Sequence, residues 1–193
     1  NGTHREAVQR YLDSGLAKNK QDAARSMRHV FSSLGAGGFE WLHSRGWDVT
    51  RFRTNIDWTG REHVLQALER GRGVIMISAH LGNWEMLLRS YLVEIGGEIV
   101  VVAADMRYPG LDHWLKKVRH EDGCRWISVR EGLIGIVRHL RRGGAVIILA
   151  DQDSRRGKGI FVDFFGRPAH TISAPARLAW KTGAGIVPFT IVR

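Results

Sequence analysis

The sequence predicts an α/β domain built in layers around a largely parallel sheet, with a helical segment in front of it. Two patterns in the 193-residue chain support this prediction. From Gly60 onward, short apolar runs alternate with segments whose apolar residues recur at helical spacing, which is typical of strands and helices stacked in layers. Before Gly60, helical spacing dominates. We therefore expect a single domain with a helical part, 1–59, and an α/β core, 60–193.

The core is expected to contain five strands, each separated from the next by a helix or a loop. The expected strands are 74–79, 98–103, 125–129, 145–150 and 185–192, and the expected helices are 60–70, 83–95, 111–121, 131–142 and 173–182. Glycine pairs end two of these helices. Residues 151–170 are predicted to form a long polar loop. In the N-terminal part, helices are expected over 4–12 and 20–45, with glycines at 35–38 interrupting the second.

The composition fits a folded domain with a strongly basic surface. Lys and Arg number 29 and Asp and Glu 19, so the formal net charge is +10. Such an excess indicates a polyanionic partner (nucleic acid, an anionic membrane, a phosphorylated substrate or an acidic carrier protein) or simply a solvated basic surface. The single cysteine, Cys124, allows no internal disulfide, which fits a reducing compartment.

The sequence contains no apolar run near 18 residues, so it predicts no membrane-spanning helix. The chain begins at Asn1 without a methionine and stops inside an expected strand. We therefore expect it to be a fragment of a longer polypeptide.

A histidine and a glutamate lie at the junction between the first expected strand and the next helix, in the stretch His-Leu-Gly-Asn-Trp-Glu. His80 would end the strand, Asn83 would cap the helix and Glu85 would lie in its first turn. A carboxylate bonded to one imidazole nitrogen leaves the other able to take a proton from a hydroxyl. The alternative is a structural histidine bonded to backbone, with Glu85 merely favourable at a helix N-terminus.

Other candidates lie after strands, where parallel sheets place their functional loops. Asp151 and Asp153 follow the expected strand 145–150 and are either site carboxylates or turn formers. Phe161, Phe164 and Phe165 lie in a basic loop, where aromatic side chains line an acyl pocket, meet a membrane or join the core. The basic neighbours that would contact phosphates or anionic headgroups are Arg155, Arg156, Lys158 and Arg167.

Several site classes lack their sequence patterns. The chain has no His-Glu-x-x-His zinc motif, no Gly-x-Gly-x-x-Gly nucleotide loop and no Gly-x-Ser-x-Gly hydrolase turn. Cys124 is the single cysteine and matches no Cys/His metal-binding or nucleophile pattern, so it is interpreted as a small buried side chain rather than a nucleophile. A non-catalytic basic module that binds nucleic acid or a membrane remains an alternative. It would give no reason for His80 and Glu85 at the end of a strand, and no nucleic-acid-binding motif is visible.

Four motifs, in the same order and at compatible distances, resemble the lipid A biosynthesis lauroyl/myristoyl acyltransferase family. They are the stretch from His80 to Glu85, Leu-Ala-Asp-Gln-Asp at 149–153, Gly-Ile-Phe-Val-Asp-Phe-Phe-Gly-Arg-Pro-Ala at 159–169 and Gly-Ile-Val-Pro-Phe at 185–189. This family belongs to the wider group of lysophospholipid and glycerol-phosphate acyltransferases. The resemblance implies an α/β/α sandwich and acyl transfer from a thioester, usually on acyl carrier protein, to a hydroxyl of a lipid A precursor. It implies no metal or redox cofactor and no nucleic acid.

The resemblance also assigns roles and a place in the cell. His80 and Glu85 match the catalytic pair, while Arg130, Asp151, Asp153, Phe164 and Phe165 are expected to bind substrate. The expected location is the cytoplasmic face of the bacterial inner membrane, peripheral or anchored by a segment outside this chain. Val-Asp-Phe-Phe-Gly and Gly-Asn-Trp also resemble a phosphatidylinositol mannoside acyltransferase, which would use acyl-CoA. Asp-Gln-Asp and Glu85 favour the lipid A type.

Overall fold

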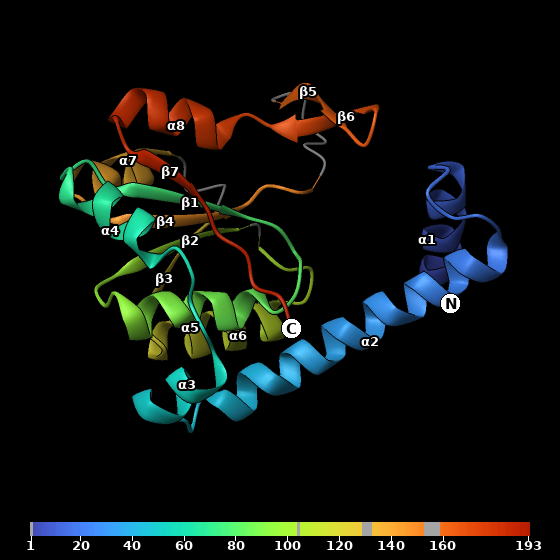
Figure 1. Cartoon of the computed structure of the whole chain (residues 1–193), viewed down its shortest axis with the longest axis horizontal. Coiled ribbons are helices and arrows are strands. Elements are labelled where there is room, and N and C mark those ends of the chain that lie inside the picture. Colours follow the sequence, from blue (N-terminus) through green and yellow to red (C-terminus); the bar gives the residue numbers. More distant parts are fainter. Residues whose placement is uncertain (1, 104, 129–132, 153–158) are drawn as a thin grey trace. The chain divides into compact units, whose positions relative to one another are not determined.

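The computed structural model describes residues 2–103, 105–128, 133–152 and 159–193, with side chains from Arg5 onward (Figure 1). The chain forms two compact units, Asn1–Ser44 and Arg45–Arg193. The division between the two units therefore falls after Ser44. The short helix α3 (Val49–Asn55) belongs to the second unit, where the side chain of Asp48 caps it by accepting a hydrogen bond from the Arg51 backbone N–H.

The first unit consists of two helices that pack against each other, α1 (Gly2–Asp13) and α2 (Lys20–Ser44). Gly15 turns the chain between them at a φ of 71°. Helix α2 continues without a break past its three glycines, so the predicted interruption at 35–38 is wrong. A glycine inside a helix costs only about 1 kcal/mol relative to alanine, which a 25-residue helix tolerates.

The second unit is built on a five-strand sheet in the order β3-β2-β4-β1-β7. The strands are β1 (Val74–Ser78), β2 (Ile99–Ala103), β3 (Cys124–Ser128), β4 (Ala145–Leu149) and β7 (Gly185–Pro188). All four pairings are parallel, which confirms the prediction from alternating strands and helices. Strand β7 is shorter than expected, although the Phe189 N–H still donates to the carbonyl of Ile77.

Helices cover both faces of this sheet. On one face, α4 (Arg61–Glu69) and α5 (Trp84–Glu94) pack on side chains such as Met76 and Ile147. On the other face, α7 (Leu133–Arg141) and α8 (Ala174–Thr182) pack on Ile75 and Val146, the residues that precede Met76 and Ile147 in the two strands. Helix α6 (Pro109–Glu121) lies beside α5 (Figure 1). The second unit is therefore an α/β/α sandwich, as expected.

The expected polar loop 151–170 contains a β-hairpin, which is a correction to the prediction. Strands β5 (Gly159–Phe164) and β6 (Arg167–Ile172) form a separate two-stranded antiparallel sheet. Phe165 and Gly166 form the turn, with φ values of 54° and 72°. Two positive φ values are typical of the tight turn that matches the twist of a hairpin. The sequence does contain a hairpin signal, because a run of β-branched and aromatic residues at 160–165 precedes Gly166.

The connections that follow the neighbouring strands β1 and β4 run to opposite faces of the sheet. The chain leaves β1 towards α5 on one face of the sheet, and after β4 it returns through the hairpin to α8 on the opposite face. In parallel α/β sheets, ligands bind where the connections of adjacent strands diverge, beyond their carboxyl ends. The fold therefore indicates a site after Ser78 and Leu149.

Candidate active site

The register of β1 and β4 brings a histidine and an aspartate together beyond the carboxyl ends of these strands. Ser78 lies opposite Leu149, and the Ala150 N–H extends the ladder by donating to the Ser78 carbonyl over 2.9 Å. Two residues beyond the paired positions, His80 and Asp151 therefore lie side by side. Both had been predicted separately as site residues, but only the sheet register joins them.

Asp151 holds His80 through two hydrogen bonds. Its Oδ1 lies 2.8 Å from the imidazole Nδ1, and its Oδ2 accepts the His80 backbone N–H over 3.0 Å. An ionised carboxylate at this place favours the tautomer with the proton on Nδ1, which leaves a lone pair on Nε2. Nε2 makes no hydrogen bond to the described residues, and the side chain is 32% exposed. This geometry is the one that a general base with an orienting carboxylate requires.

Glu85 makes different contacts from those expected. Its carboxylate pairs with Arg119 of α6, which donates from Nε over 3.1 Å and from its terminal nitrogen in a second, parallel bond. The guanidinium in turn lies over the Trp126 ring, 4.8 Å from its centroid. Only 11% of the Glu85 side chain and 13% of Arg119 are exposed. The carboxylate bonded to the imidazole is thus Asp151 instead of Glu85, because the first turn of α5 directs Glu85 towards α6.

Trp84 connects Glu85 with His80. The indole Nε1 of Trp84 donates to Glu85 Oε1 over 3.2 Å, and its ring meets the His80 ring edge to face at 5.1 Å. By fixing the indole, Glu85 limits the positions that the imidazole can take. The indole of Trp84 thus lies between the Glu85 carboxylate and the His80 imidazole.

The turn between His80 and α5 depends on Gly82 and Asn83. Gly82 has a φ of 63°, and a Cβ there would lie 2.1 Å from the carbonyl oxygen of Ile191. No side chain fits between these two backbones, which is why this position is glycine. Asn83 is buried and caps α5 by accepting the Met86 N–H. The turn that carries His80 is therefore held by two contacts, the close approach of Gly82 to Ile191 and the cap of α5 by Asn83.

The remaining predicted residues have mixed outcomes. Arg130 and Asp153 lie outside the described residues, as do Arg155, Arg156 and Lys158. Phe164 and Phe165 lie at the tip of the β5–β6 hairpin and are exposed, which excludes a place in the core.

Cys124 is buried, as interpreted, and its burial together with the negative charges of Glu85 and Asp122 raises its pKa to about 12. A thiol with that pKa is a poor nucleophile.

Exposed apolar side chains gather at the carboxyl edge of the sheet, a feature that the sequence reasoning missed. Leu81 follows β1, Met106 and Tyr108 follow β2, and Ile134 lies in the first turn of α7 after β3. Single exposed apolar residues are ordinary, but several loops that present them at one edge form an apolar rim. We refer to these four residues as the apolar rim.

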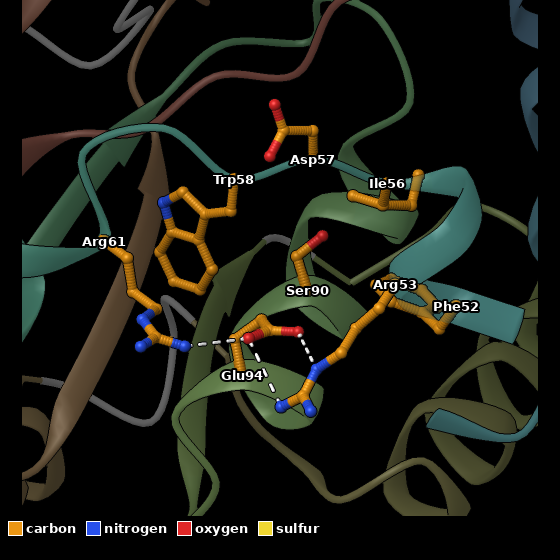
Figure 2. A pocket seen from close by; sticks show the side chains of 8 residues that line it. All are labelled: Phe52, Arg53, Ile56, Asp57, Trp58, Arg61, Ser90 and Glu94. Atoms are coloured by element: carbon orange, nitrogen blue, oxygen red, sulfur yellow. Dashed lines mark hydrogen bonds and ion pairs between the residues drawn. The ribbon is translucent and has the colours of Figure 1, made fainter. Parts of the chain in front are cut away.

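A hollow of about 200 Å³ lies towards the C-terminal end of α5, away from His80 (Figure 2). It is lined by Phe52, Arg53, Ile56, Asp57, Trp58, Arg61, Ser90 and Glu94. Arg53 and Arg61 both bind the Glu94 carboxylate, over 2.7 and 3.0 Å. The hydrogen bond from Arg53, followed by the charges of both arginines, lowers the Glu94 pKa. This hollow is a junction that ties α3 and the start of α4 to α5, and it contains no residue of the His80 pair.

Comparison with known proteins places this architecture in a family. The model of the bacterial lipid A biosynthesis acyltransferase family matches residues 4–193. A phosphatidylinositol mannoside acyltransferase of Mycobacterium tuberculosis is 31% identical over 133 residues, covering 67% of this chain and 42% of that protein. The lipid A biosynthesis lauroyltransferase of Escherichia coli is 25% identical over 172 residues, covering 89% of this chain and 55% of that protein.

The chain thus spans about half the length of the curated relatives it matches. The family match nevertheless covers nearly all of its residues, in both compact units. No helix in the described ranges is both long and apolar enough to cross a bilayer. The extent of the match decides the assignment: this chain belongs to the bacterial lipid A biosynthesis acyltransferase family.

Proposed function

We propose that this protein transfers a fatty acyl group from a thioester to a hydroxyl of a glycolipid, with His80 as the general base. The observation that carries the proposal is the contact of His80 Nδ1 with Asp151 beyond the carboxyl ends of the neighbouring strands β1 and β4. Family membership gives the reaction class. An imidazole with its proton on Nδ1 has a free lone pair on Nε2, which is what a general base needs.

The proposed reaction needs no covalent enzyme intermediate. Nε2 of His80 takes the proton of the acceptor hydroxyl while the oxygen attacks the thioester carbonyl. When the tetrahedral intermediate collapses, the C–S bond breaks and the imidazolium returns the proton to the leaving thiolate. Asp151 stabilises the imidazolium that forms between these steps. A positioned base of this kind typically contributes about 10²- to 10⁴-fold in rate.

Two features of the chain support the proposed substrates. The apolar rim follows the same edge of the sheet as the His80 pair and would contact an acyl chain, and the net charge of +10 suits an anionic donor and a phosphorylated acceptor. We propose acyl carrier protein as the donor, because an acidic protein gains most from a basic surface in association rate. The proposed acceptor is a lipid A precursor, and the proposed location is the cytoplasmic face of the inner membrane.

A second candidate is acyl transfer from acyl-CoA to a phosphatidylinositol mannoside. It is favoured by the identity to the Mycobacterium tuberculosis relative, which is higher than that to the Escherichia coli lauroyltransferase. Both candidates use His80 in the same way and differ in the carrier of the acyl group and in the acceptor.

The test is a matrix of two donors and two acceptors with the full-length protein. Acyl carrier protein and CoA carry the same acyl chain, and the acceptors are a lipid A precursor and a mannosylated phosphoinositide. Transfer from the carrier protein to the lipid A precursor, lost in His80→Ala, is the expected result. Transfer from acyl-CoA to the mannosylated lipid alone would replace it by the second candidate. Nucleic acid binding with no thioester consumed in any combination would contradict both and favour a binding module.

A further inference from the structure

The β5–β6 hairpin exposes apolar side chains along most of its length. Exposure reaches 73% for Phe161, 61% for Phe164 and 78% for Phe165. The hairpin lies beyond the N-terminal end of α8 and is separate from the five-strand sheet (Figure 1). A two-stranded hairpin is only marginally stable in water, and exposed aromatic clusters usually mark an interaction surface. The exposed aromatic side chains of the hairpin therefore form a candidate interaction surface.

The base of the hairpin is anchored, whereas its tip projects. Ile172, at the end of β6, packs against the core cluster under α7 and α8. Six paired positions separate this end from the turn, and strands of that length span about 20 Å. The aromatic residues near the turn are thus held away from the sandwich by an element whose other end is fixed.

One face of the hairpin combines apolar side chains with a cation. Residues directly opposite in an antiparallel pair share a face, and alternate residues along a strand do too. Val162 pairs with Ala169, and Phe164 pairs with Arg167, so all four lie on one face. Arg167 is exposed and makes no ion pair with the described residues. At the tip of the hairpin, this face therefore carries the Phe164 ring beside Arg167.

The turn holds an aromatic side chain where the backbone disfavours it. Phe165 is the one non-glycine residue in the described chain with a positive φ, 54°. Asparagine, aspartate or glycine would adopt this conformation with less strain. The turn is held by Asp163, whose Oδ1 accepts the Gly166 N–H over 2.8 Å, and the Phe165 ring meets Phe164 edge to face at 4.6 Å. A strained, exposed phenylalanine is best explained by contact with a partner.

We propose that the tip of the hairpin, Phe164 and Phe165, inserts into the interface of an anionic lipid bilayer, with Arg167 at the level of the lipid phosphates. Aromatic rings beside a cation suit the boundary between headgroups and acyl chains. The net charge of +10 complements an anionic surface. The proposal deepens the proposed function, because it names the element that would hold the enzyme at its lipid substrate, but insertion is measurable without acyl transfer.

The experiment measures sedimentation of the full-length protein with vesicles of phosphatidylcholine, alone or mixed with phosphatidylglycerol. The central variant is Phe165→Asn, because asparagine before Gly166 suits the turn better than phenylalanine and so removes the ring without weakening the hairpin. Partition into the mixed vesicles is expected to fall about tenfold, the effect of exposing one large aromatic side chain. Phe165→Trp serves as the matched control and is expected to bind as the natural protein does.

Arg167→Gln tests the charged part of the same face. It should weaken binding to the mixed vesicles about fivefold at low salt, with no change on phosphatidylcholine alone, because one cation near an anionic surface contributes on that scale. The difference should shrink as the ionic strength rises.

Three results would overturn the proposal. One is unchanged vesicle binding by Phe165→Asn. Another is an equal loss in Phe165→Trp. The third is a concentration-dependent dimer, seen by light scattering without vesicles and abolished by Phe165→Asn, which would assign the tip to a second copy of the chain. His80→Ala separates this proposal from the proposed function, because it should bind vesicles normally while losing transfer. If transfer is never observed but binding still depends on Phe165, the insertion stands and the proposed function fails.

Discussion

Asp151 binds both the backbone N–H and the imidazole Nδ1 of His80, so one carboxylate contacts the main chain and the ring of the same histidine. The two residues are 71 positions apart in the chain and meet because β1 and β4 are hydrogen-bonded neighbours in a fixed register. Glu85 is only five positions from His80, yet its carboxylate is bonded to Arg119. The carboxylate that contacts His80 is therefore Asp151, and the first prediction compares Asp151 with Glu85.

Asp151→Asn should lower kcat by about 10²- to 10⁴-fold with little change in thermal unfolding. The amide can still accept the backbone N–H, but its NH₂ group cannot accept the proton of Nδ1. Glu85→Gln, the matched control, should cost less activity because Glu85 reaches His80 only through Trp84. Steady-state kinetics of both variants check this. A larger loss in Glu85→Gln, with the fold intact, would return Glu85 to a direct role.

Removing Arg119 should destabilise the protein. Arg119→Met leaves the nearly buried Glu85 carboxylate without its cation, so the free energy of unfolding should fall by roughly 3 kcal/mol. Adding Glu85→Gln to this variant should recover part of the loss, because no uncompensated charge is then left. Urea unfolding of the two single variants and the double variant measures the coupling. Simple additivity would show that the two side chains do not act as a pair.

Gly82→Ala should disturb the turn that carries His80. The substitution combines a disfavoured φ with a contact of 2.1 Å to the Ile191 carbonyl, so we expect a loss of more than about 2 kcal/mol. Gly96→Ala is a suitable control, because Gly96 has a φ of 77° but open space around its Cα. It should lose only about 1 kcal/mol. Equal losses in the two variants, measured by denaturant unfolding, would show that the contact with Ile191 adds nothing.

The Glu94 junction should give a stability difference that depends on pH. Arg53, and then Arg61, lower the pKa of Glu94 in the folded protein below its ordinary value of 4.5. The stabilisation is therefore fully present above that value and is lost as the pH falls through the lower, folded pKa. Because both arginines are substantially exposed, it amounts to at most about 1 kcal/mol.

Comparison with Glu94→Gln tests this dependence. At pH 7 the natural protein should be the more stable of the two, and the difference should shrink steadily below pH 4.5. Parallel unfolding curves of both proteins across this range provide the measurement. A difference that stays constant down to acid pH would mean that the charge of Glu94 does not contribute.

Local sequence patterns determined the layered architecture. Alternating apolar runs and helical stripes predicted all five parallel strands, because each element has to bury its own apolar face. The same patterns placed His80 and Asp151 after strands, since the end of a strand is a local property. The polar and glycine-rich neighbours of 159–172 predict a loop, whereas the β-branched and aromatic residues within this segment form a hairpin. The glycines of α2 do not interrupt the helix, because helix propensity is only a weak bias.

What the tertiary structure decided is which of these residues meet. The sequence suggested Glu85 as the partner of His80 because the two are close in the chain. The choice of Asp151 depends on the pairing of β1 with β4, and the choice of Arg119 for Glu85 depends on the placement of α6 beside α5. The exposure of Phe165 is likewise a property of the folded chain. Such pairings are set by contacts between distant segments, which no local pattern of residues encodes.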